Sequence, residues 1–449
     1  MIRIPLSEFA AALNCPAPAR DVVIESIVTD SRKVHHGSLF AALPGSNVDG
    51  HDYAGSAVKL GAMALLVSRP LDLDIPQLVV DDVLAAMGRL AAMLRRRVNP
   101  FVIGITGSNG KTTVKEMVAS ILRLKGGVLA TQGNYNNELG VPLSLFRLKS
   151  SHRYAVLEMG ASKAGDIAYL AEIAKPDLGL VTNIGPAHLG GFGSEEGVAR
   201  AKGEMFAALP ADGSAVFNAD EPWLGLWKEM SSARHSITFG SQPGADVQFV
   251  EQAGRSLITT PFGDFEPSLA LPGLHNLINA TAATAVALAM NIDLGMIEQG
   301  LETVKPVPGR LNRIQTEAGW TVIDDTYNAN PASLYSALQV LAGMHGTPWL
   351  VLGDMKELGQ SSRKLHREVG EAAKAMGVRR LFTIGEMSVH TAEAFGSGAQ
   401  HFEHRGELAA ELLSILNPDI ICLVKGSRSM GMEAIVEAIT ATPEMREAS

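Results

Sequence analysis

Hydrophobic and polar positions alternate along the chain in a way that predicts strands followed by helices. The run Phe101–Thr106 is short, apolar and β-branched, which is typical of a buried strand. From Val114 to Ile121, apolar residues recur at i, i+3, i+4 and i+7, the spacing of one buried helix face. The same alternation continues to about residue 308 and predicts a central domain with a parallel, doubly wound sheet.

The segments on either side of this central region predict two further domains. Residues 1–82 mix short strand candidates with polar turns, as expected of a small α/β domain. A helix from Val83 to Arg97, with Asp82 as its N-cap, is expected to lead into the central strand. We therefore predict an α/β protein of three domains: a small N-terminal domain at 1–82, a central P-loop-type domain at 83–308 and a Rossmann-like domain at 309–449.

The third domain carries clear strand signals. Buried strands are expected at Trp320–Asp325, Trp349–Leu352, Arg380–Ile384 and Ile420–Val424. Asn330 is a natural N-cap and Pro331 suits a first helical position, which predicts a helix from there to about Leu341. Within the central domain, residues 215–272 predict strands that cover one side. The segment Leu271–Asn276 then introduces a small-residue helix that runs through Leu288, and its alanines allow close packing on the sheet.

Composition limits the class of protein. A length of 449 residues is too long for one core, and 46% hydrophobic with 19% charged residues is ordinary for a soluble protein. The net charge of −9 argues against nucleic-acid binding, which needs a basic face. The N-terminal segment lacks a signal-peptide pattern, and the longest apolar run, Ala280–Met290, is too short to cross a bilayer. Cys15 and Cys422 are expected to be free thiols in a reducing compartment, so we expect a cytoplasmic protein without membrane insertion.

A glycine-rich turn joins the predicted central strand to its helix. Gly107 and Gly110 let backbone N–H groups approach a polyphosphate at the positive end of the helix. Lys111 would neutralise the terminal phosphates, and the Thr112 hydroxyl is placed to bind Mg²⁺. The strict phosphate-loop pattern has a glycine where Ile105 stands, so the alternative is an ordinary strand–helix turn with an exposed lysine.

Polar residues also follow other predicted strands of the central domain. Glu158 ends one strand and His188 follows the next, and such strand ends share the sheet edge of the phosphate loop. Both residues are candidates for a metal–phosphate site; the alternatives are a partly exposed strand end and an ordinary loop histidine. One loop carries three asparagines that suit hydrogen bonds to an amide or sugar, or equally a bare turn: Asn134, Asn136 and Asn137.

The third domain offers polar groups for a short peptide. Tyr327, Asn328 and Asn330 provide a hydroxyl and amides that suit the peptide group and carboxylate of a dipeptide. Lys425, at another strand end of the same domain, could pair with the terminal carboxylate. The alternative is that Asn330 only caps a helix and Tyr327 only packs. In the N-terminal domain, Asp30–Arg32 could recognise a uracil or diphosphate, although such a segment is as often a surface turn.

Several of these segments, in this order, resemble the Mur ligases, ATP-dependent amide-forming enzymes of peptidoglycan synthesis. They are Thr106–Thr113, Thr182–His188, Ala201–Glu204, Leu274–Asn276 and Gly309–Arg310. The resemblance covers nearly the whole chain and accounts for the missing first glycine of the phosphate loop. Two longer segments, Asp324–Pro331 and Leu352–Gly359, resemble the member that joins D-alanyl-D-alanine to UDP-MurNAc-tripeptide as the last cytoplasmic step of precursor synthesis.

The resemblance implies a role for each candidate residue. ATP would be bound by Gly107, Ser108, Asn109, Gly110, Lys111, Thr112, Thr113, Asn276, Arg310 and Asp325. Two Mg²⁺ ions would be held by Thr112, Glu158, His188 and Lys202. Lys202 would be carried as a carbamate, which turns a cation into oxygen ligands, and would be catalytic together with Lys111 and His188. The uridine nucleotide would be gripped by Ser31, Arg32, Asp49 and His51.

The implied reaction has two steps. A peptide carboxylate attacks the γ-phosphate of ATP, which gives ADP and an acyl phosphate; the amine of the second substrate then attacks that carbonyl and phosphate leaves. The first step depends mainly on positioning and charge neutralisation, so a lysine and two metal ions matter more than any nucleophilic side chain. The residues do not name the base that deprotonates the incoming amine. A monomer that binds only small molecules is expected.

Two other functions compete with this one. A ligase of the same fold could add a single amino acid, as folylpolyglutamate synthases do, but the segment Asp324–Pro331 argues against it. A P-loop switch could instead hydrolyse nucleotide to move a partner, but no Asn-Lys-x-Asp guanine motif occurs in the sequence. Hydrolysis of nucleotide without any acceptor would favour the switch.

Overall fold

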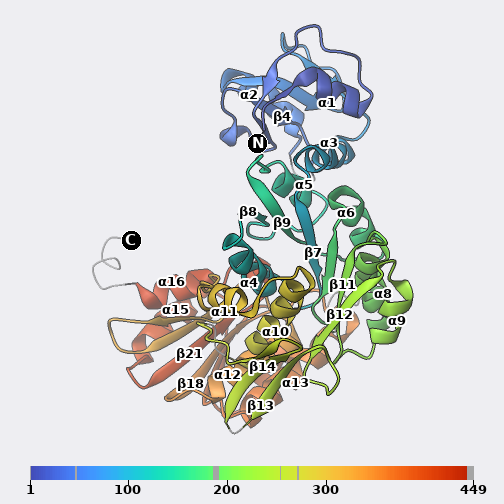
Figure 1. The fold of residues 1–449 in the computed structure, drawn as a ribbon. Coiled ribbons are helices and arrows are strands. Elements are labelled where there is room, and N and C mark those ends of the chain that lie inside the picture. The colour runs from blue at the N-terminus through green and yellow to red at the C-terminus, as the bar shows by residue number, and fades with distance from the viewer. Residues whose placement is uncertain (1, 46–47, 186–191, 253, 271–272, 442–449) are drawn as a thin grey trace.

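The computed structural model describes residues 2–45, 48–185, 192–252, 254–270 and 273–441. It contains three successive α/β regions, each built on its own main sheet, and the N-terminal region projects from the central one (Figure 1). The predicted α/β architecture of three domains is therefore confirmed.

The N-terminal region has a parallel four-stranded sheet with a short antiparallel pair beside it. Its strands are β1 Ile4–Pro5, β2 Val23–Ile24, β3 Ser26–Val28, β4 Ser38–Ala41, β5 Ala62–Val67 and β6 Gln77–Val79. Its helices are α1 Leu6–Leu13 and α2 Ala54–Lys59. Helix α3 Val83–Val98 follows and packs both on α1 and on helices of the central region. As predicted, Asp82 caps α3, since its side chain accepts the N–H of Ala85.

The central region has a nine-stranded sheet in the order β15-β14-β13-β12-β11-β10-β7-β9-β8. Its parallel strands are β7 Phe101–Thr106, β8 Gly127–Ala130, β9 His152–Glu158, β10 Leu178–Val181, β11 Ser214–Asn218 and β12 His235–Gly240. Strand β7 pairs with β9 on one side and with β10 on the other, so the winding of the chain reverses at β7. Open parallel sheets bind ligands outside the carboxyl ends of their strands at such a reversal.

One sequence prediction for this region is wrong. Residues 215–272 were expected to supply strands that cover one side of the domain, but β11 to β15 extend the same sheet at its edge. The last three are β13 Val247–Gln252, β14 Arg255–Thr260 and β15 Gly263–Phe265; β13 runs parallel to β12, and β14 and β15 follow as antiparallel strands. A half-buried hairpin has the same alternating pattern whether it continues a sheet or covers one, so the pattern does not distinguish the two arrangements.

Helices cover both faces of the central sheet. They are α4 Lys111–Arg123, α5 Gly140–Leu145, α6 Asp166–Ala174, α8 Glu195–Ala207, α9 Leu224–Met230, α10 Leu274–Ala289 and α11 Leu294–Glu302. Side chains of β7 alternate between the two faces: Ile103 packs with α4 and α10, whereas Val102 packs with α3 and α6. The alanines of α10 allow the close packing on the sheet that the sequence predicts, and α10 also packs on α4.

The third region has a six-stranded sheet in the order β16-β17-β21-β18-β19-β20, parallel except for β16. Its strands are β16 Asn312–Gln315, β17 Thr321–Asp325, β18 Thr347–Gly353, β19 Arg380–Ile384, β20 Ala399–Phe402 and β21 Ile420–Lys425. Its helices are α12 Pro331–Ala342, α13 Ser362–Ala375, α14 Val389–Phe395, α15 Arg405–Ile415 and α16 Glu433–Thr440. The four predicted strands and the predicted start of α12 are confirmed.

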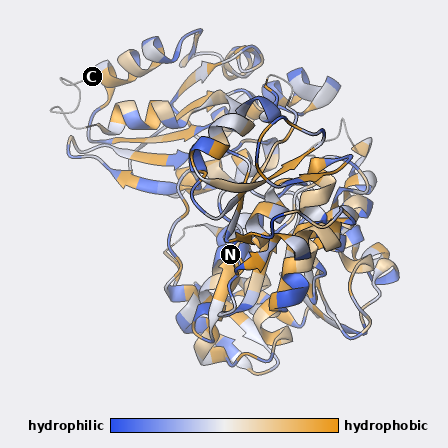
Figure 2. Cartoon of the chain, turned by 90° about the horizontal axis from the view of Figure 1, so that it is seen from above, coloured by the Kyte–Doolittle hydropathy of each residue, from blue (hydrophilic) through white to orange (hydrophobic). Residues whose placement is uncertain are grey.

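Hydrophobic residues concentrate on the strands and on the helix faces that pack against them (Figure 2). Among the described residues, no helix is both long and apolar enough to cross a membrane.

Candidate active site

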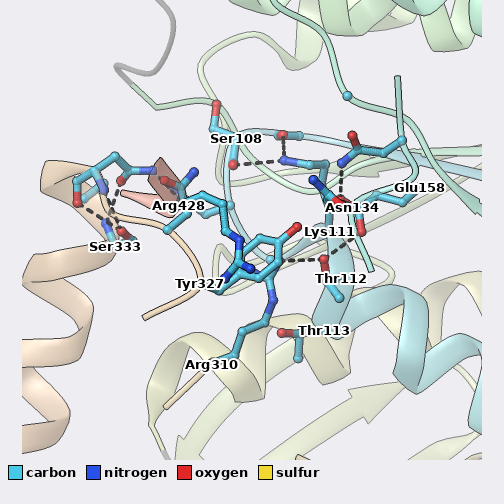
Figure 3. Close-up of a pocket in the computed structure, with 18 of the residues that line it drawn as sticks. Ser108, Lys111, Thr112, Thr113, Asn134, Glu158, Arg310, Tyr327, Ser333 and Arg428 are labelled. Carbon is cyan, nitrogen blue, oxygen red and sulfur yellow. Dashed lines mark hydrogen bonds between the residues drawn. The ribbon is translucent and has the colours of Figure 1, made fainter. Parts of the chain in front are cut away.

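A cavity of about 900 Å³ opens where the carboxyl ends of the central strands face the third region. The central region contributes the phosphate loop 107–113, Glu158 and Lys202 to its lining. The third region contributes Arg310 and the segment after β17, which includes Tyr327. Two segments far apart in the sequence therefore share one cavity (Figure 3).

The phosphate loop has the backbone that its two glycines permit. Gly107 has φ +144° and Gly110 has φ +80°, a region that side-chain-bearing residues rarely adopt. A Cβ on Gly107 would lie 1.9 Å from the Oγ1 atom of Thr182, and one on Gly110 would lie 2.4 Å from the Oδ1 atom of Asn279. Both positions therefore disfavour any residue with a side chain.

Lys111 begins helix α4 and bends back over the loop. Its Nζ atom donates to the carbonyl oxygens of Gly107, at 2.7 Å, and Ser108, at 3.2 Å. Desolvation lowers the pKa of Lys111, Glu158 opposes that shift and the nearby Arg310 adds to it. An anion placed in the loop would stabilise this ammonium, as a polyphosphate does at the N-terminus of a helix.

Thr112 and Glu158 form a buried pair beside the lysine. The Thr112 hydroxyl donates to the Oε2 atom of Glu158 at 2.6 Å, and the amide of Asn136 donates to Oε1 at 2.7 Å. Thr112 is 4% exposed and Glu158 is 1% exposed. The strand-end position predicted for Glu158 therefore leads into the site rather than to the surface.

Lys202 lies on α8 and is almost completely buried, with 3% of its surface exposed. Within the described part of the chain, no carboxylate forms an ion pair with its ammonium. Desolvation, followed by repulsion from Lys111, lowers the pKa of Lys202 to about 7. A substantial fraction of this lysine is therefore a neutral amine near neutral pH, unlike a lysine on a solvated helix face.

Arg310 reaches from the third region into the central one. Its Nη2 atom donates to the Thr112 hydroxyl at 2.8 Å, and its guanidinium carbon lies 4.0 Å from the centre of the Tyr327 ring (Figure 3). The Arg310 Nε atom is buried and has no hydrogen-bond partner among the described residues. An unpaired donor on a buried cation is a position at which an anionic ligand gains a hydrogen bond.

Asp325 and Lys425 lie opposite each other on neighbouring parallel strands, β17 and β21. The Lys425 ammonium forms an ion pair with the Asp325 carboxylate and donates to the carbonyl oxygen of Asn328 at 3.0 Å. Asp325 also accepts the backbone N–H of Leu311 at 3.2 Å. The structure thus joins two residues for which the sequence suggested different ligands, and this pair holds the segments that carry Arg310 and Asn328.

Other predicted site residues also line the cavity. They are Ser108, Asn109, Thr113, Asn134, Asn137, Asn276 and Asn330. The Oδ1 atom of Asn137 accepts the N–H of Gly140 at the start of α5, which is the turn role that the sequence left open. His188 lies outside the described residues.

The predicted uridine-binding residues lie in the N-terminal region and do not line this cavity. Arg32 and Asp30 form a local ion pair of 2.9 Å, with the Arg32 side chain 88% exposed. The buried His51 ring is held by Asp49 through Nδ1 at 2.6 Å, and its Nε2 accepts the N–H of Ser68 at 2.9 Å. Ser31 begins the short 3-10 turn Ser31–Lys33, which Asp30 caps.

Many residues of the cavity are not among the site residues that the sequence predicts, and three of them are basic. Lys356 and Arg428 are exposed cations at its rim, paired with Asp354 at 2.9 Å and Glu433 at 3.0 Å respectively. His275 lies near Lys425, and burial lowers its pKa to about 4, so it is a neutral imidazole at pH 7. Lys356 and His275 lie in two of the segments that resemble the family, Leu352–Gly359 and Leu274–Asn276, but the spacing of these residues alone indicates no ligand. Arg428 lies outside those segments.

The donors around Thr112 fit Mg²⁺ held mainly by phosphate oxygens. Within the described residues, no three His, Cys, Asp or Glu side chains cluster as a complete protein cage. Mg²⁺ prefers one or two protein oxygens together with water and substrate phosphates. The Thr112 hydroxyl and the Glu158 carboxylate, next to a loop suited to phosphates, provide that set.

A glycine-rich strand–helix loop that faces a second domain across a cavity is typical of multidomain proteins that close over a nucleotide. Three family models match this chain: "Mur ligase family, catalytic domain" at residues 23–98, "Mur ligase middle domain" at 105–287, and "Mur ligase, glutamate ligase domain" at 309–428. The chain belongs to the Mur ligase family.

Relatives match over nearly the full length. The UDP-N-acetylmuramoyl-tripeptide–D-alanyl-D-alanine ligase of Escherichia coli strain K12 is 44% identical over 448 residues, which cover 98% of this chain and 99% of the relative. A crystal structure of MurF from Acinetobacter baumannii has a TM-score of 0.90 at 35% identity and covers 98% of this chain and 99% of that one. The MurF ligase of Thermotoga maritima in complex with ADP has a TM-score of 0.83 at 29% identity and covers 94% and 98%.

Proposed function

We propose that this protein is an ATP-dependent ligase that joins D-alanyl-D-alanine to UDP-MurNAc-tripeptide. The observation that carries the proposal is the shared cavity, in which a phosphate loop meets Arg310 and the Tyr327–Asn330 segment of another domain. Full-length similarity to ligases named for this reaction supports the choice of substrates. The ADP complex of the Thermotoga maritima relative supports the nucleotide. The product would be the UDP-MurNAc-pentapeptide precursor of peptidoglycan, made by a monomer in the cytoplasm.

The phosphate loop and Arg310 would bind the triphosphate from opposite sides. Backbone N–H groups of the loop and the Lys111 ammonium would contact the phosphates. The Arg310 Nε atom, which has no hydrogen-bond partner in the described part of the chain, would add a contact from the third domain. Their combined positive charge would stabilise the charge that spreads over the γ-phosphoryl group during transfer. Asn276, on the first turn of α10, would face the adenosine part of ATP.

Thr112 and Glu158 would hold Mg²⁺, and Lys202 would hold a second ion as a carbamate. Bound Mg²⁺ would neutralise phosphate charge and orient the transferred group. The lowered pKa of Lys202 supports the carbamate, because only the neutral amine adds to CO₂. The predicted ligand His188 has no described geometry, and its role stays a prediction.

The third domain would orient the amine substrate. Tyr327 and Asn328 lie at the carboxyl end of β17, where the acyl phosphate formed at the phosphate loop could be reached. The Lys425 ammonium is already engaged by Asp325 and by Asn328. The rim cations Lys356 and Arg428 also have carboxylate partners, but their side chains are exposed. They are therefore better placed than the buried Lys425 to exchange a partner for the dipeptide's terminal carboxylate.

Ser31, Arg32, Asp49 and His51 remain the proposed contacts of the uridine nucleotide. The exposed Arg32 guanidinium would pair with the diphosphate after leaving Asp30, while the Asp49–His51 pair would fix the shape of the adjoining turn.

The experiment that tests the function measures products. Purified protein is incubated with ATP, Mg²⁺, UDP-MurNAc-tripeptide and D-alanyl-D-alanine, and the products are weighed by mass spectrometry. One ADP should form per UDP-MurNAc-pentapeptide, and ADP formation should require both substrates. Steady ADP formation without either substrate would instead favour a nucleotide-hydrolysing switch.

A further inference from the structure

One hydrogen bond connects the phosphate loop directly to the helix that follows the proposed dipeptide site. The Asn330 Nδ2 atom donates to the Oδ1 atom of Asn109 at 2.9 Å, across 221 residues of sequence. Asn109 is the third residue of the loop that begins at Gly107, and Asn330 is the N-cap of α12. The contact therefore joins the two halves of the cavity without any ligand.

Both ends of this hydrogen bond are fixed by their own surroundings. The Asn109 backbone N–H donates to the Oδ1 atom of Asn183 at 2.9 Å, and its carbonyl accepts the Thr182 hydroxyl at 2.6 Å. On the other side, the Asn330 Oδ1 atom accepts the N–H of Ser333 at 2.9 Å, and Ser333 Oγ accepts the Asn330 N–H at 3.1 Å. Because the capping box uses the Asn330 Oδ1 atom, only the Nδ2 group of this side chain is available for a hydrogen bond to the phosphate loop.

Both polar atoms of the Asn330 side chain already have a protein partner. The oxygen accepts the helix-capping hydrogen bond from Ser333, and the nitrogen donates to Asn109. Tyr327 and Asn328 precede it on the same short segment and lie nearer the end of β17. A shift of the phosphate loop that moves Asn109 would therefore also move the segment that carries Tyr327 and Asn328.

We propose that Asn330 is a positioning residue. Its hydrogen bond to Asn109 couples nucleotide binding at the phosphate loop to ordering of the Tyr327–Asn330 segment, which is proposed to bind the amine substrate. The proposal deepens the proposed function and rests on it. Coupling of this kind is reciprocal: a nucleotide that orders the loop favours docking of α12, and a bound amine favours the nucleotide equally. A neutral hydrogen bond supports a coupling of about five-fold, or about 1 kcal/mol.

The test variants separate the interdomain contact from the helix cap. Asn330→Ser keeps an N-cap oxygen but lacks the amide donor. Asn109→Ala removes the hydrogen-bond acceptor on the central domain. The two variants should therefore behave alike, although one alters the third domain and the other the central domain. Ser333→Ala removes the hydroxyl half of the capping box and keeps the backbone N–H that Asn330 caps, which makes it the matched control.

Hydrogen–deuterium exchange of the full chain, with and without Mg²⁺ and the non-hydrolysable analogue AMP-PNP, reads both sites at once. In the wild type and in Ser333→Ala, AMP-PNP should slow exchange at residues 107–118 and, by about five-fold, at residues 326–335. In Asn330→Ser and Asn109→Ala, protection at 107–118 should persist while the added protection at 326–335 is lost. At saturating ATP, these two variants should also raise the KM for D-alanyl-D-alanine several-fold.

The outcomes that overturn the coupling differ from those that overturn the function. Equal protection at 326–335 in Asn330→Ser and wild type, or protection only at 107–118 in the wild type, overturns the coupling and leaves nucleotide binding intact. A wild type that shows no protection at 107–118 overturns ATP binding and the coupling with it.

Discussion

Replacing Lys202 by Met should change how the stability of the fold depends on pH. Burial lowers the pKa of Lys202 from 10.5 to about 7 in the folded protein. Between these two values the unfolded chain binds one proton more than the folded chain does, so wild-type stability rises with pH through this window. Met has a similar unbranched side chain without a titrating group, so the variant lacks this contribution.

The size of this stability change follows from the pH range over which the folded and unfolded chains bind different numbers of protons. Each pH unit inside it changes the free energy of unfolding by up to about 1.4 kcal/mol. Between pH 7.5 and 9.5, the stability advantage of Lys202→Met over the wild type should therefore shrink by about 2–3 kcal/mol. At pH 7.5 the variant should be the more stable protein, because it removes a buried amine that has no ion pair among the described residues.

Urea unfolding in CO₂-free buffer at the two pH values measures this difference. Trp227 contributes a suitable fluorescence signal, since its indole N–H donates to the carbonyl of Ala199 on α8, the helix that carries Lys202. A stability difference that does not change with pH would refute the lowered pKa and with it the neutral amine. When ¹³C-bicarbonate is added, the wild type should acquire a labelled carbamate that Lys202→Met lacks.

The variant Lys202→Ala should lose most ligase activity. A small carboxylate added to the assay should restore part of that activity.

Three further predictions concern the cavity. Lys111→Ala should abolish substrate-dependent ADP formation while circular dichroism stays unchanged, because the loop loses its only cation; normal turnover would contradict this. Gly107→Ala should weaken nucleotide binding at least ten-fold by calorimetry, because the new Cβ would lie 1.9 Å from Thr182 Oγ1, and unchanged affinity would show that the loop tolerates a side chain. Arg428→Gln should raise the KM for D-alanyl-D-alanine several-fold and leave the KM for ATP unchanged; an equal rise in both would argue against a contact with the dipeptide.

Local patterns predicted the elements that depend on neighbouring residues. The strand Phe101–Thr106, its glycine turn and the following helix are encoded within one stretch, and the structure has them at the expected positions. The caps of α3 and α12 were also predictable, because Asp82 and Asn330 bond to N–H groups three residues away.

Contacts between distant segments could not be read from the same patterns. Arg310 meets Thr112 across 198 residues, and Lys425 meets Asp325 across 100, through strand order and register that no local spacing specifies. The sequence therefore suggested separate ligands for Asp325 and Lys425, which the structure pairs. The edge strands β13 to β15 were misjudged for the same reason, since their pattern does not say which strand they will join.

The choice of amine is the most direct test of the proposed function. D-alanyl-D-alanine and single D- or L-amino acids are supplied at equal concentration with ATP, Mg²⁺ and UDP-MurNAc-tripeptide, and the ligated products are separated by mass. We expect nearly all product to carry the dipeptide, since the polar groups at the end of β17 suit a peptide and its carboxylate. Preferential ligation of a free amino acid would contradict it.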